Sequence, residues 1–282
     1  MKKGRTGQSL IGTVAIYVVC IFLAVICILP FWIMVVNATR STPEIQAHAI
    51  SLIPSTHLFD NLKILSGKSF SPMVGFRNSI IVSTCATALA VYFSTLTAYA
   101  IVVYDWKLRR AFFIFIMAVM MIPGQVTVIG FYQMMYKIGW TNSFLPLILP
   151  AIAAPTMVFF MKQYMEPALS LEIIQSARID GAKEFFIFNR IALPIMKPAI
   201  ATQAIFSFVT NWNNLFLPSI LLTKDKLKTM PVMVSMLKGD IYRTEYGSIY
   251  LGLTLTVLPL FIVYFLLSKY IIAGVALGSV KG

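Results

Sequence analysis

The chain has 282 residues, of which 59% are hydrophobic and only 12% are charged. A soluble globular domain carries about 25% charged residues, so this composition excludes an ordinary soluble protein and requires a surface that faces lipid. The formal net charge of +13 does not indicate a nucleic-acid partner, because the basic residues lie between long apolar runs and form no basic stripe with stacking aromatic residues.

Six apolar stretches follow one another along the chain, and each is long enough to cross about 30 Å of hydrocarbon as a helix. They are Leu10–Val36, Asn78–Tyr104, Ala111–Gly130, Phe144–Met161, Ala199–Leu222 and Gly247–Ser268. The fourth contains three prolines, so we expect it to be kinked and packed against protein that satisfies the freed backbone groups. The expected fold class is an all-α membrane protein with six transmembrane helices.

The charges of the short loops predict the orientation. The N-terminal tail and the 105–110 turn each carry three basic residues, whereas the 131–143 loop carries one. The positive-inside rule therefore places both termini and the 162–198 loop in the cytoplasm. We expect three parts: residues 1–76 with the tail, first helix and outer loop, a core of residues 77–268, and a cytoplasmic tail of residues 269–282.

Functional groups that are missing from the expected spans constrain the mechanism. None of the six contains Asp, Glu, Lys, Arg or His, so no proton relay or intramembrane metal site is expected, although sodium coupling through neutral oxygens stays open. The phosphate-loop pattern G-x-x-x-x-G-K-[ST] does not occur, so this chain is expected to bind no nucleotide or other cofactor itself. Uphill transport would then need energy from another subunit.

The 162–198 loop is long and patterned. Leu171, Ile174, Ala177 and Ile179 recur at near-helical spacing. Gly181 can adopt the left-handed conformation that ends a short helix, and Asp180 can cap the next one. Four small residues would let a partner approach closely: Ser176, Ala177, Gly181 and Ala182. The alternative is an ordinary amphipathic helix at the membrane interface.

This loop resembles the cytoplasmic signature E-A-A-x(3)-G-x(9)-I-x-L-P of binding-protein-dependent ABC importer permeases. The signature appears here as Gln175-Ser176-Ala177, Gly181, Ile191 and Leu193-Pro194, with the common variant ARIDGA over 177–182. Five further segments resemble the maltose-type carbohydrate permeases: 78–83 (NSIIVS), 97–100 (TAYA), 120–123 (MMIP), 211–218 (NWNNLFLP) and 278–282 (GSVKG).

The resemblance implies a type I importer in a bacterial cytoplasmic membrane. Two sister permease subunits pair, a dimer of ATP-binding cassette ATPases binds ATP and docks on the short cytoplasmic helices, and an extracellular solute-binding protein delivers the sugar. Ala177 and Gly181 would then lie at the docking surface, and the 223–246 loop would face the binding protein. Glutamine at position 175 replaces the usual glutamate, so docking would rely more on packing, or on Glu172 and Arg178.

Five polar or aromatic residues are candidates for contact with a sugar in the translocation path. Trp212 offers a ring face, and Asn211, Asn213 and Asn214 offer hydrogen bonds beside it, as does Gln125 next to a Pro-Gly break. The alternative is that these side chains join helices to one another. Two rival functions also remain: the same machinery importing a non-sugar solute, and a self-sufficient secondary transporter.

Overall fold

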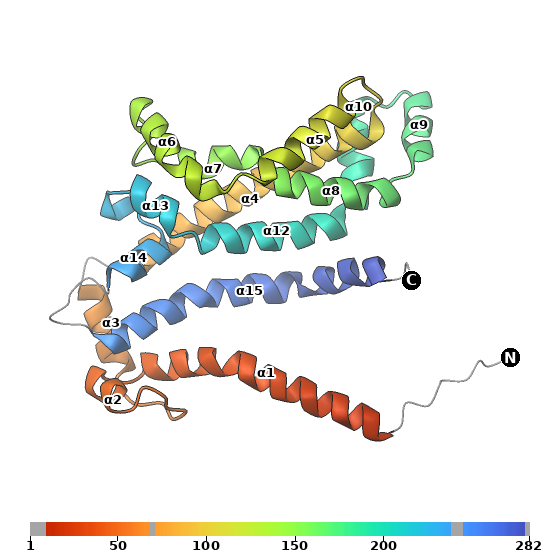
Figure 1. Ribbon diagram of the computed structural model, residues 1–282. Coiled ribbons are helices and arrows are strands. Elements are labelled where there is room, and N and C mark those ends of the chain that lie inside the picture. The colour runs from red at the N-terminus through yellow and green to blue at the C-terminus, as the bar shows by residue number, and fades with distance from the viewer. Residues whose placement is uncertain (1–9, 68–70, 238–244, 280–282) are drawn as a thin grey trace. The chain divides into compact units, whose positions relative to one another are not determined.

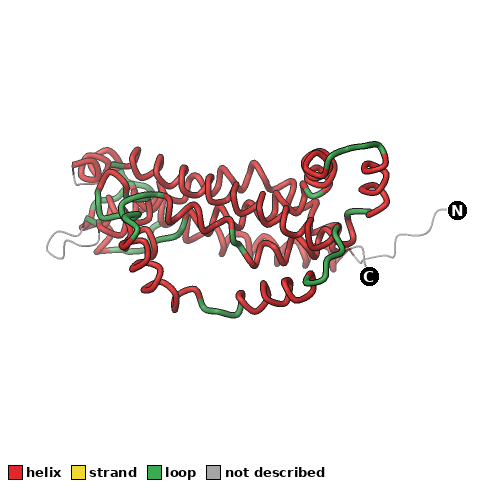
Figure 2. The backbone as a smooth tube through the Cα atoms, turned by 90° about the horizontal axis from the view of Figure 1, so that it is seen from above, coloured by secondary structure: helices red, strands yellow, loops and turns green. Residues whose placement is uncertain are grey.

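The computed structural model describes residues 10–67, 71–237 and 245–279, and all regular structure in these ranges is helical (Figure 2). The chain divides into two compact units. The first comprises Met1–Phe70 and Met236–Val257, and the second comprises Ser71–Ser235 and Leu258–Gly282. The long helix α15 (Tyr246–Ser279) begins in the first unit and ends in the second.

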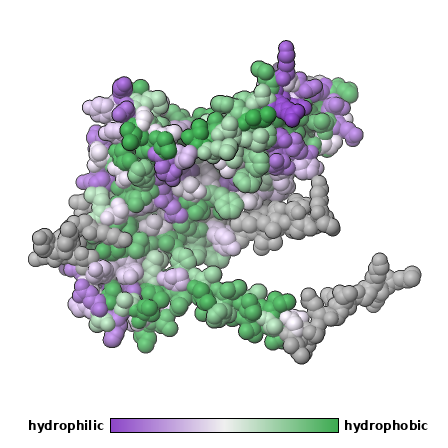
Figure 3. All heavy atoms as spheres, viewed as in Figure 1, coloured by the Kyte–Doolittle hydropathy of each residue, from purple (hydrophilic) through white to green (hydrophobic). Residues whose placement is uncertain are grey.

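The first unit contains α1 (Leu10–Ala38), α2 (Thr42–Ala47), α3 (Leu58–Gly67) and the start of α15 (Figure 1). Helix α1 is apolar on every side, and Figure 3 shows it as a nearly continuous hydrophobic surface. Its most apolar 18-residue window has no residue buried within this chain. A helix that is hydrophobic all round needs lipid or another protein around it.

Buried polar groups join the end of α1 to α2 and α3. The guanidinium of Arg40 donates hydrogen bonds to the side-chain oxygen of Asn37 (3.0 Å) and to the carbonyls of His48 (2.7 Å) and Glu44 (2.8 Å). The amide of Asn61 in turn donates to the carbonyl of Arg40 (2.9 Å). Because a buried charge is tolerated only when its donors are satisfied, this cluster fixes the conformation of the turn after α1.

The second unit is built around α4 (Pro72–Val103), which packs against α8 and α12. Its other elements are α5 (Arg109–Met120), α6 (Gly124–Lys137), α7 (Leu145–Ile148), η1 (Leu149–Ile152), α8 (Pro155–Ala168), α9 (Leu171–Ile179), α10 (Glu184–Ile187), η2 (Phe188–Ala192), α11 (Leu193–Ile195), α12 (Lys197–Trp212), α13 (Phe216–Leu221), η3 (Asp225–Leu227) and α14 (Met230–Met236). Helices α9 and α10 lie at one end of α4, and α13 and α14 lie at the other (Figure 1).

Three predicted spans are helices of sufficient length and apolarity: Gly12–Ala38, Pro72–Val103 and Leu145–Ala168. The last of these is irregular, as its prolines predict, and consists of α7, the 3-10 helix η1 and α8. The sixth predicted span lies on α15, where Tyr246–Ile262 is a shorter apolar helix by the same criteria.

The third and fifth predicted spans each consist of two helices, and the break in the third lies at the Pro-Gly pair that the sequence marks. Helices α5 and α6 meet at 93°, because Pro123 has an extended backbone and disfavours a helical conformation in the preceding residue. The stretch 199–222 breaks between Trp212 and Phe216, where α12 ends and α13 begins. A second bent pair joins Glu184–Ile195 to Lys197–Trp212 at 80°. Counting this pair and the α5–α6 pair as one span each, up to five spans occur among the described residues.

Candidate functional site

The α9 helix has well-defined ends. The hydroxyl of Ser170 accepts a hydrogen bond from the Glu172 N–H (3.2 Å) and caps the N-terminus. At the other end Gly181 has φ +79°, its N–H donates to the carbonyl of Arg178 (3.0 Å), and the N–H of Ala182 donates to the carbonyl of Ala177 (3.0 Å). This pair of hydrogen bonds is a Schellman motif, so the prediction of a left-handed glycine that ends the helix is confirmed.

The role expected for Asp180 is wrong. Asp180 is the C-terminal cap of α9, and the residue before α10 is Lys183. The reason is that residues 181 and 182 still belong to the turn that closes α9, so the next helix begins only at Glu184.

The two faces of α9 differ in what they present. Ile174 and Ala177 are buried in the core formed with α4, α8 and α10, so Ala177 supports the helix from inside and does not lie on an exposed docking surface. Gln175, Ser176 and Gly181 are exposed. The surface over α9 and α10 is largely hydrophilic in Figure 3.

Ile179 is one of the apolar residues at near-helical spacing, but it does not share the buried face of α9 and is 86% exposed. Position 179 lies five residues after Ile174, which turns it away from the face that Ile174 and Ala177 share. On α10, Phe185 and Phe186 are also largely exposed. An exposed apolar side chain among polar ones is typical of a surface that a partner covers. For Ile179, the helical spacing in the sequence is sufficient to indicate that the side chain points away from the buried face.

A polar network connects α9 and α10 to the end of α4. The Nε of Arg178 donates to one carboxylate oxygen of Glu184 (2.5 Å), and the hydroxyl of Tyr104 donates to the other (2.5 Å). The Tyr99 hydroxyl lies 3.4 Å from the same oxygen, and the Arg178 guanidinium lies 5.2 Å from the centre of the Tyr104 ring. Arg178 therefore contacts its own chain, whereas the side chain of Glu172 is exposed.

Two ionisable groups of this network are held in the form that makes these bonds. The hydrogen bond to Glu184 raises the pKa of Arg178, so the guanidinium stays charged. Burial, followed by the hydrogen bond to Glu184, raises the pKa of Tyr104, so its hydroxyl stays a donor at neutral pH. The network therefore persists across the physiological pH range.

After α10 the chain returns toward α12 through the π-helical turn η2 and α11. Ile191 and Leu193 are half-buried against the same core as Ile174, whereas Pro194 is exposed at the start of α11. The motif residues at this end thus connect the α9 core to the membrane helix.

The structure divides the predicted translocation residues. Asn211 and Asn214 line a cavity of 360 Å³ among α6, η1 and α12, together with Thr127. Among the described residues the side-chain amide of Asn214 has no hydrogen-bond partner, whereas that of Asn211 donates to the Ser207 carbonyl (2.9 Å). Gln125 directly follows Gly124, which lines the cavity, but Gln125 itself does not line it. Asn213 does not line the cavity either, and its side chain is exposed.

Trp212 is a packing residue in this structure. It is 1% exposed, and its ring lies 5.7 Å from that of Phe208 and 6.2 Å from that of Phe76, measured between ring centroids. The alternative that these residues join helices to one another therefore holds for Trp212.

Comparison with known proteins decides the family. The family described as binding-protein-dependent transport system inner membrane component matches residues 90–276, which is more than half of the chain. The chain belongs to this family. It is therefore a membrane-embedded permease that works with partner subunits in an ABC transporter.

Relatives of the permease match it over nearly their whole length. It is 34% identical to the arabinooligosaccharides transport system permease protein AraQ of Halalkalibacterium halodurans over 93% of this chain and 94% of that one. It is 32% identical to the lactose transport system permease protein LacG of Rhizobium radiobacter, over 94% and 95%. The sn-glycerol-3-phosphate transport system permease protein UgpE of Pectobacterium atrosepticum is 28% identical, over 87% and 89%.

A solved structure confirms the type I permease fold. A bacterial ABC transporter involved in the import of the acidic polysaccharide alginate contains a chain that superposes on this one with a TM-score of 0.79. The likeness covers 96% of this chain and 100% of that one, at 20% sequence identity.

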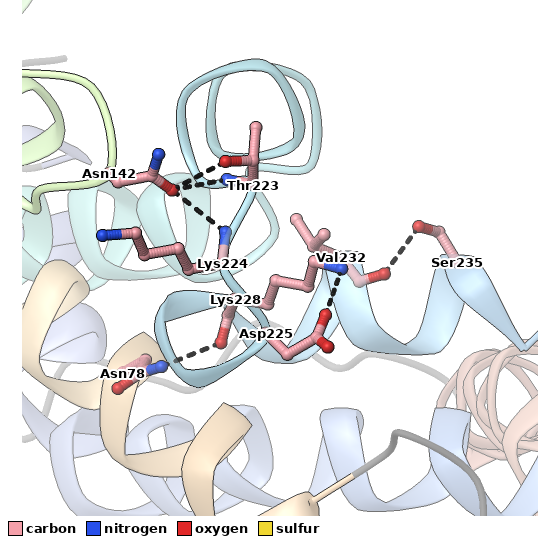
Figure 4. A network of polar contacts seen from close by, with 8 residues as sticks. All are labelled: Asn78, Asn142, Thr223, Lys224, Asp225, Lys228, Val232 and Ser235. Atoms are coloured by element: carbon pink, nitrogen blue, oxygen red, sulfur yellow. Dashed lines mark hydrogen bonds and ion pairs between the residues drawn. The ribbon is translucent and has the colours of Figure 1, made fainter.

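At the end of α4 opposite α9, polar side chains fix the first part of the 223–246 loop (Figure 4). The side-chain oxygen of Asn142 accepts from the N–H groups of Thr223 (2.8 Å) and Lys224 (3.0 Å). The amide of Asn78 donates to the carbonyls of Lys226 and Lys228, both at 3.0 Å.

The N–H of Met230 donates to the hydroxyl of Ser79 (2.9 Å). Asn78 and Ser79, which the sequence analysis names only as part of the NSIIVS segment, thus hold this loop in place. Residues 238–244 of the loop lie outside the described part of the chain.

The network on α9 gives a testable expectation. Arg178→Gln and Glu184→Gln should each lower uptake by the assembled transporter several-fold, because each breaks the link between α9 and α4. The double variant should be no worse than either single variant, since both remove the same interaction. Folding stability should change by only about 0–1 kcal/mol, because both side chains are more than a third exposed.

Lys183→Gln is the matched control, since Lys183 is exposed, adjacent and outside the network. Uptake rates and ATPase rates of the wild type, the two single variants and the double variant form a double-mutant cycle. Losses that simply add in the double variant would show that Arg178 and Glu184 act separately.

Proposed function

We propose that this permease imports a sugar across a bacterial cytoplasmic membrane, using ATP hydrolysed by a separate ATPase dimer that docks on α9. One observation carries the proposal: a short, capped helix presents an exposed face at one end of the membrane unit and is tied to the spanning helix α4 through Glu184. A force applied to α9 would thus reach α4 through Arg178, Glu184 and Tyr104.

Docking would use the exposed side of α9. Gln175 and Ser176 offer hydrogen bonds, Ile179 offers an apolar contact, and Gly181 has open space where a side chain would otherwise stand. ATP-driven closure of the ATPase pair would move α9 and α10 as one piece, because Ile174 and Ile187 share one core. Alternating access would follow from rearrangement of α4 against its neighbours.

The remaining parts follow from the same proposal. A sister permease would complete the pathway, and the loop fixed by Asn78 and Asn142 would face a solute-binding protein outside the cell. Both termini would then lie in the cytoplasm. The permease itself would bind no cofactor, and ATP would lie on the partner ATPase.

A sugar is the substrate class that the observations favour. The cavity lined by Asn211, Asn214 and Thr127 offers neutral hydrogen-bonding groups, and its 360 Å³ lies within the usual range of about 300–1,000 Å³ for small-molecule sites. Among the described residues its lining contains no charged side chain, which disfavours a phosphorylated solute such as that named for UgpE. The names of the AraQ and LacG relatives support the same class.

Uptake of a panel of labelled oligosaccharides by a strain that carries the complete transporter tests this proposal. Asn214→Leu should reduce uptake of the transported sugar up to about tenfold, since one hydrogen bond is worth about 0.5–1.5 kcal/mol. Asn213→Leu is the matched control, because Asn213 is the preceding residue and does not line the cavity. Equal uptake by both variants would exclude the cavity from the sugar path, and uptake of no sugar in the panel would refute the substrate class.

A further inference from the structure

A second cavity, of 410 Å³, lies where α4 ends and α5 begins. It is bounded by α4, α5, α8 and the first residue of α9. Its lining includes Arg109, Arg110, Phe113, Lys162, Glu166 and Leu171. The proposed sugar path does not use this cavity, since the residues that line the 360 Å³ cavity lie on other helices.

The charged residues of this second cavity leave a positive surplus, because three basic side chains face one acidic side chain. The Lys162 ammonium is fixed 2.5 Å from Glu166 and 4.7 Å from the centre of the Phe113 ring. Arg109 lies 3.8 Å from the highly exposed Asp105. In the described ranges Arg110 has neither an ion pair nor a hydrogen bond through its side chain. Such a cavity attracts an anion.

The surroundings of the cavity are those of a membrane surface. Trp106, in the turn between α4 and α5, is 37% exposed, and tryptophan is enriched where membrane meets water. On α5 itself, Arg110 is followed one turn later by exposed Ile114, and Phe115 is also exposed. The basic cavity thus lies next to an exposed apolar face of α5 that suits contact with lipid. A ligand with a phosphate head and hydrocarbon tails matches both parts.

We propose that this cavity binds the headgroup of an anionic phospholipid. The phosphate lies among Arg109, Arg110 and Lys162, and the acyl chains run along the exposed face of α5. The ligand also touches Leu171, the first residue of α9, so that occupancy stiffens the base of this helix. The effect on ATP-driven transport rests on the proposed docking role of α9, whereas lipid binding itself does not.

Native mass spectrometry of the purified transporter, with sister permease and ATPase present, tests the binding. The probes are phosphatidylglycerol, phosphatidylcholine and inorganic phosphate. The wild-type complex should retain phosphatidylglycerol and not phosphatidylcholine. Arg110→Gln with Lys162→Gln should weaken retention roughly 10- to 30-fold, as expected for two basic residues near a membrane surface. Glutamine keeps most of each side chain, so packing changes little.

Lys107→Gln with Lys183→Gln is the matched control, since it removes two exposed positive charges near the same end of α4 and neither lines the cavity. It should retain phosphatidylglycerol like the wild type. Equal weakening in both double variants, displacement of the lipid by millimolar inorganic phosphate, or binding only after the ATPase is removed would each overturn the proposal. Retention by a complex that fails to transport would still support it and would count against the proposed function alone.

Discussion

Gly181→Val should abolish uptake while the permease still inserts into the membrane at normal levels. Gly181 has φ +79°, a conformation that costs a residue with a side chain roughly 1–2 kcal/mol, and a branched side chain adds crowding of the backbone. A Cβ at this position would meet no atom within 4 Å, so the damage is to the backbone turn and not to the core. The Schellman turn would open and α9 would lose its C-terminal end.

Gly181→Asn is the control for this variant, because asparagine tolerates the left-handed conformation. It should keep most of the uptake unless the partner approaches too closely for any side chain. Uptake, ATP hydrolysis and membrane content are measured together. Normal uptake by Gly181→Val at normal protein levels would show that the α9 turn takes no part in coupling.

Gly247→Ala should destabilise the first unit by about 3 kcal/mol or more, which is the upper range for overpacking. A Cβ at Gly247 would lie 2.3 Å from the carbonyl oxygen of Arg40 and 2.5 Å from the side-chain amide of Asn61. Arg40 and Asn61 belong to the buried cluster that fixes the turn after α1, so neither can move without losing hydrogen bonds. We expect poor accumulation and a lower unfolding temperature.

Gly130→Ala on α6 is the matched substitution, because a Cβ there meets no atom within 4 Å. It should be neutral or slightly stabilising, since alanine is favoured over glycine inside a helix by about 0.5–1 kcal/mol. Thermal unfolding of both purified variants provides the comparison. Equal unfolding temperatures would contradict the close approach of Gly247 to Arg40.

The features that the sequence predicts well are those that depend on neighbouring residues in the chain. The apolar runs, the irregular fourth span and the left-handed Gly181 depend on residues close together in the chain, such as Pro146, Pro150 and the Arg178 carbonyl. The break at Pro123 was visible in the sequence, but a hydrophobic run alone does not distinguish a straight span from two helices that meet at 93°.

Long-range contacts were not predictable. The Asn78 amide binds carbonyls about 150 positions away, and the Tyr104 hydroxyl binds Glu184 from a different helix. No periodic pattern indicates such partners. Trp212 shows the same limit, because its aromatic ring suits sugar stacking and core packing equally until Phe76 and Phe208 are placed beside it.

The most direct test of the central claim is ATP-dependent accumulation of a labelled oligosaccharide in proteoliposomes. With the permease alone we expect neither ATP hydrolysis nor accumulation. With the sister permease, the ATPase dimer and the binding protein we expect both, and replacing ATP by ADP should stop accumulation. Accumulation by the isolated permease, driven by a sodium or proton gradient without any ATPase, would contradict the proposed function.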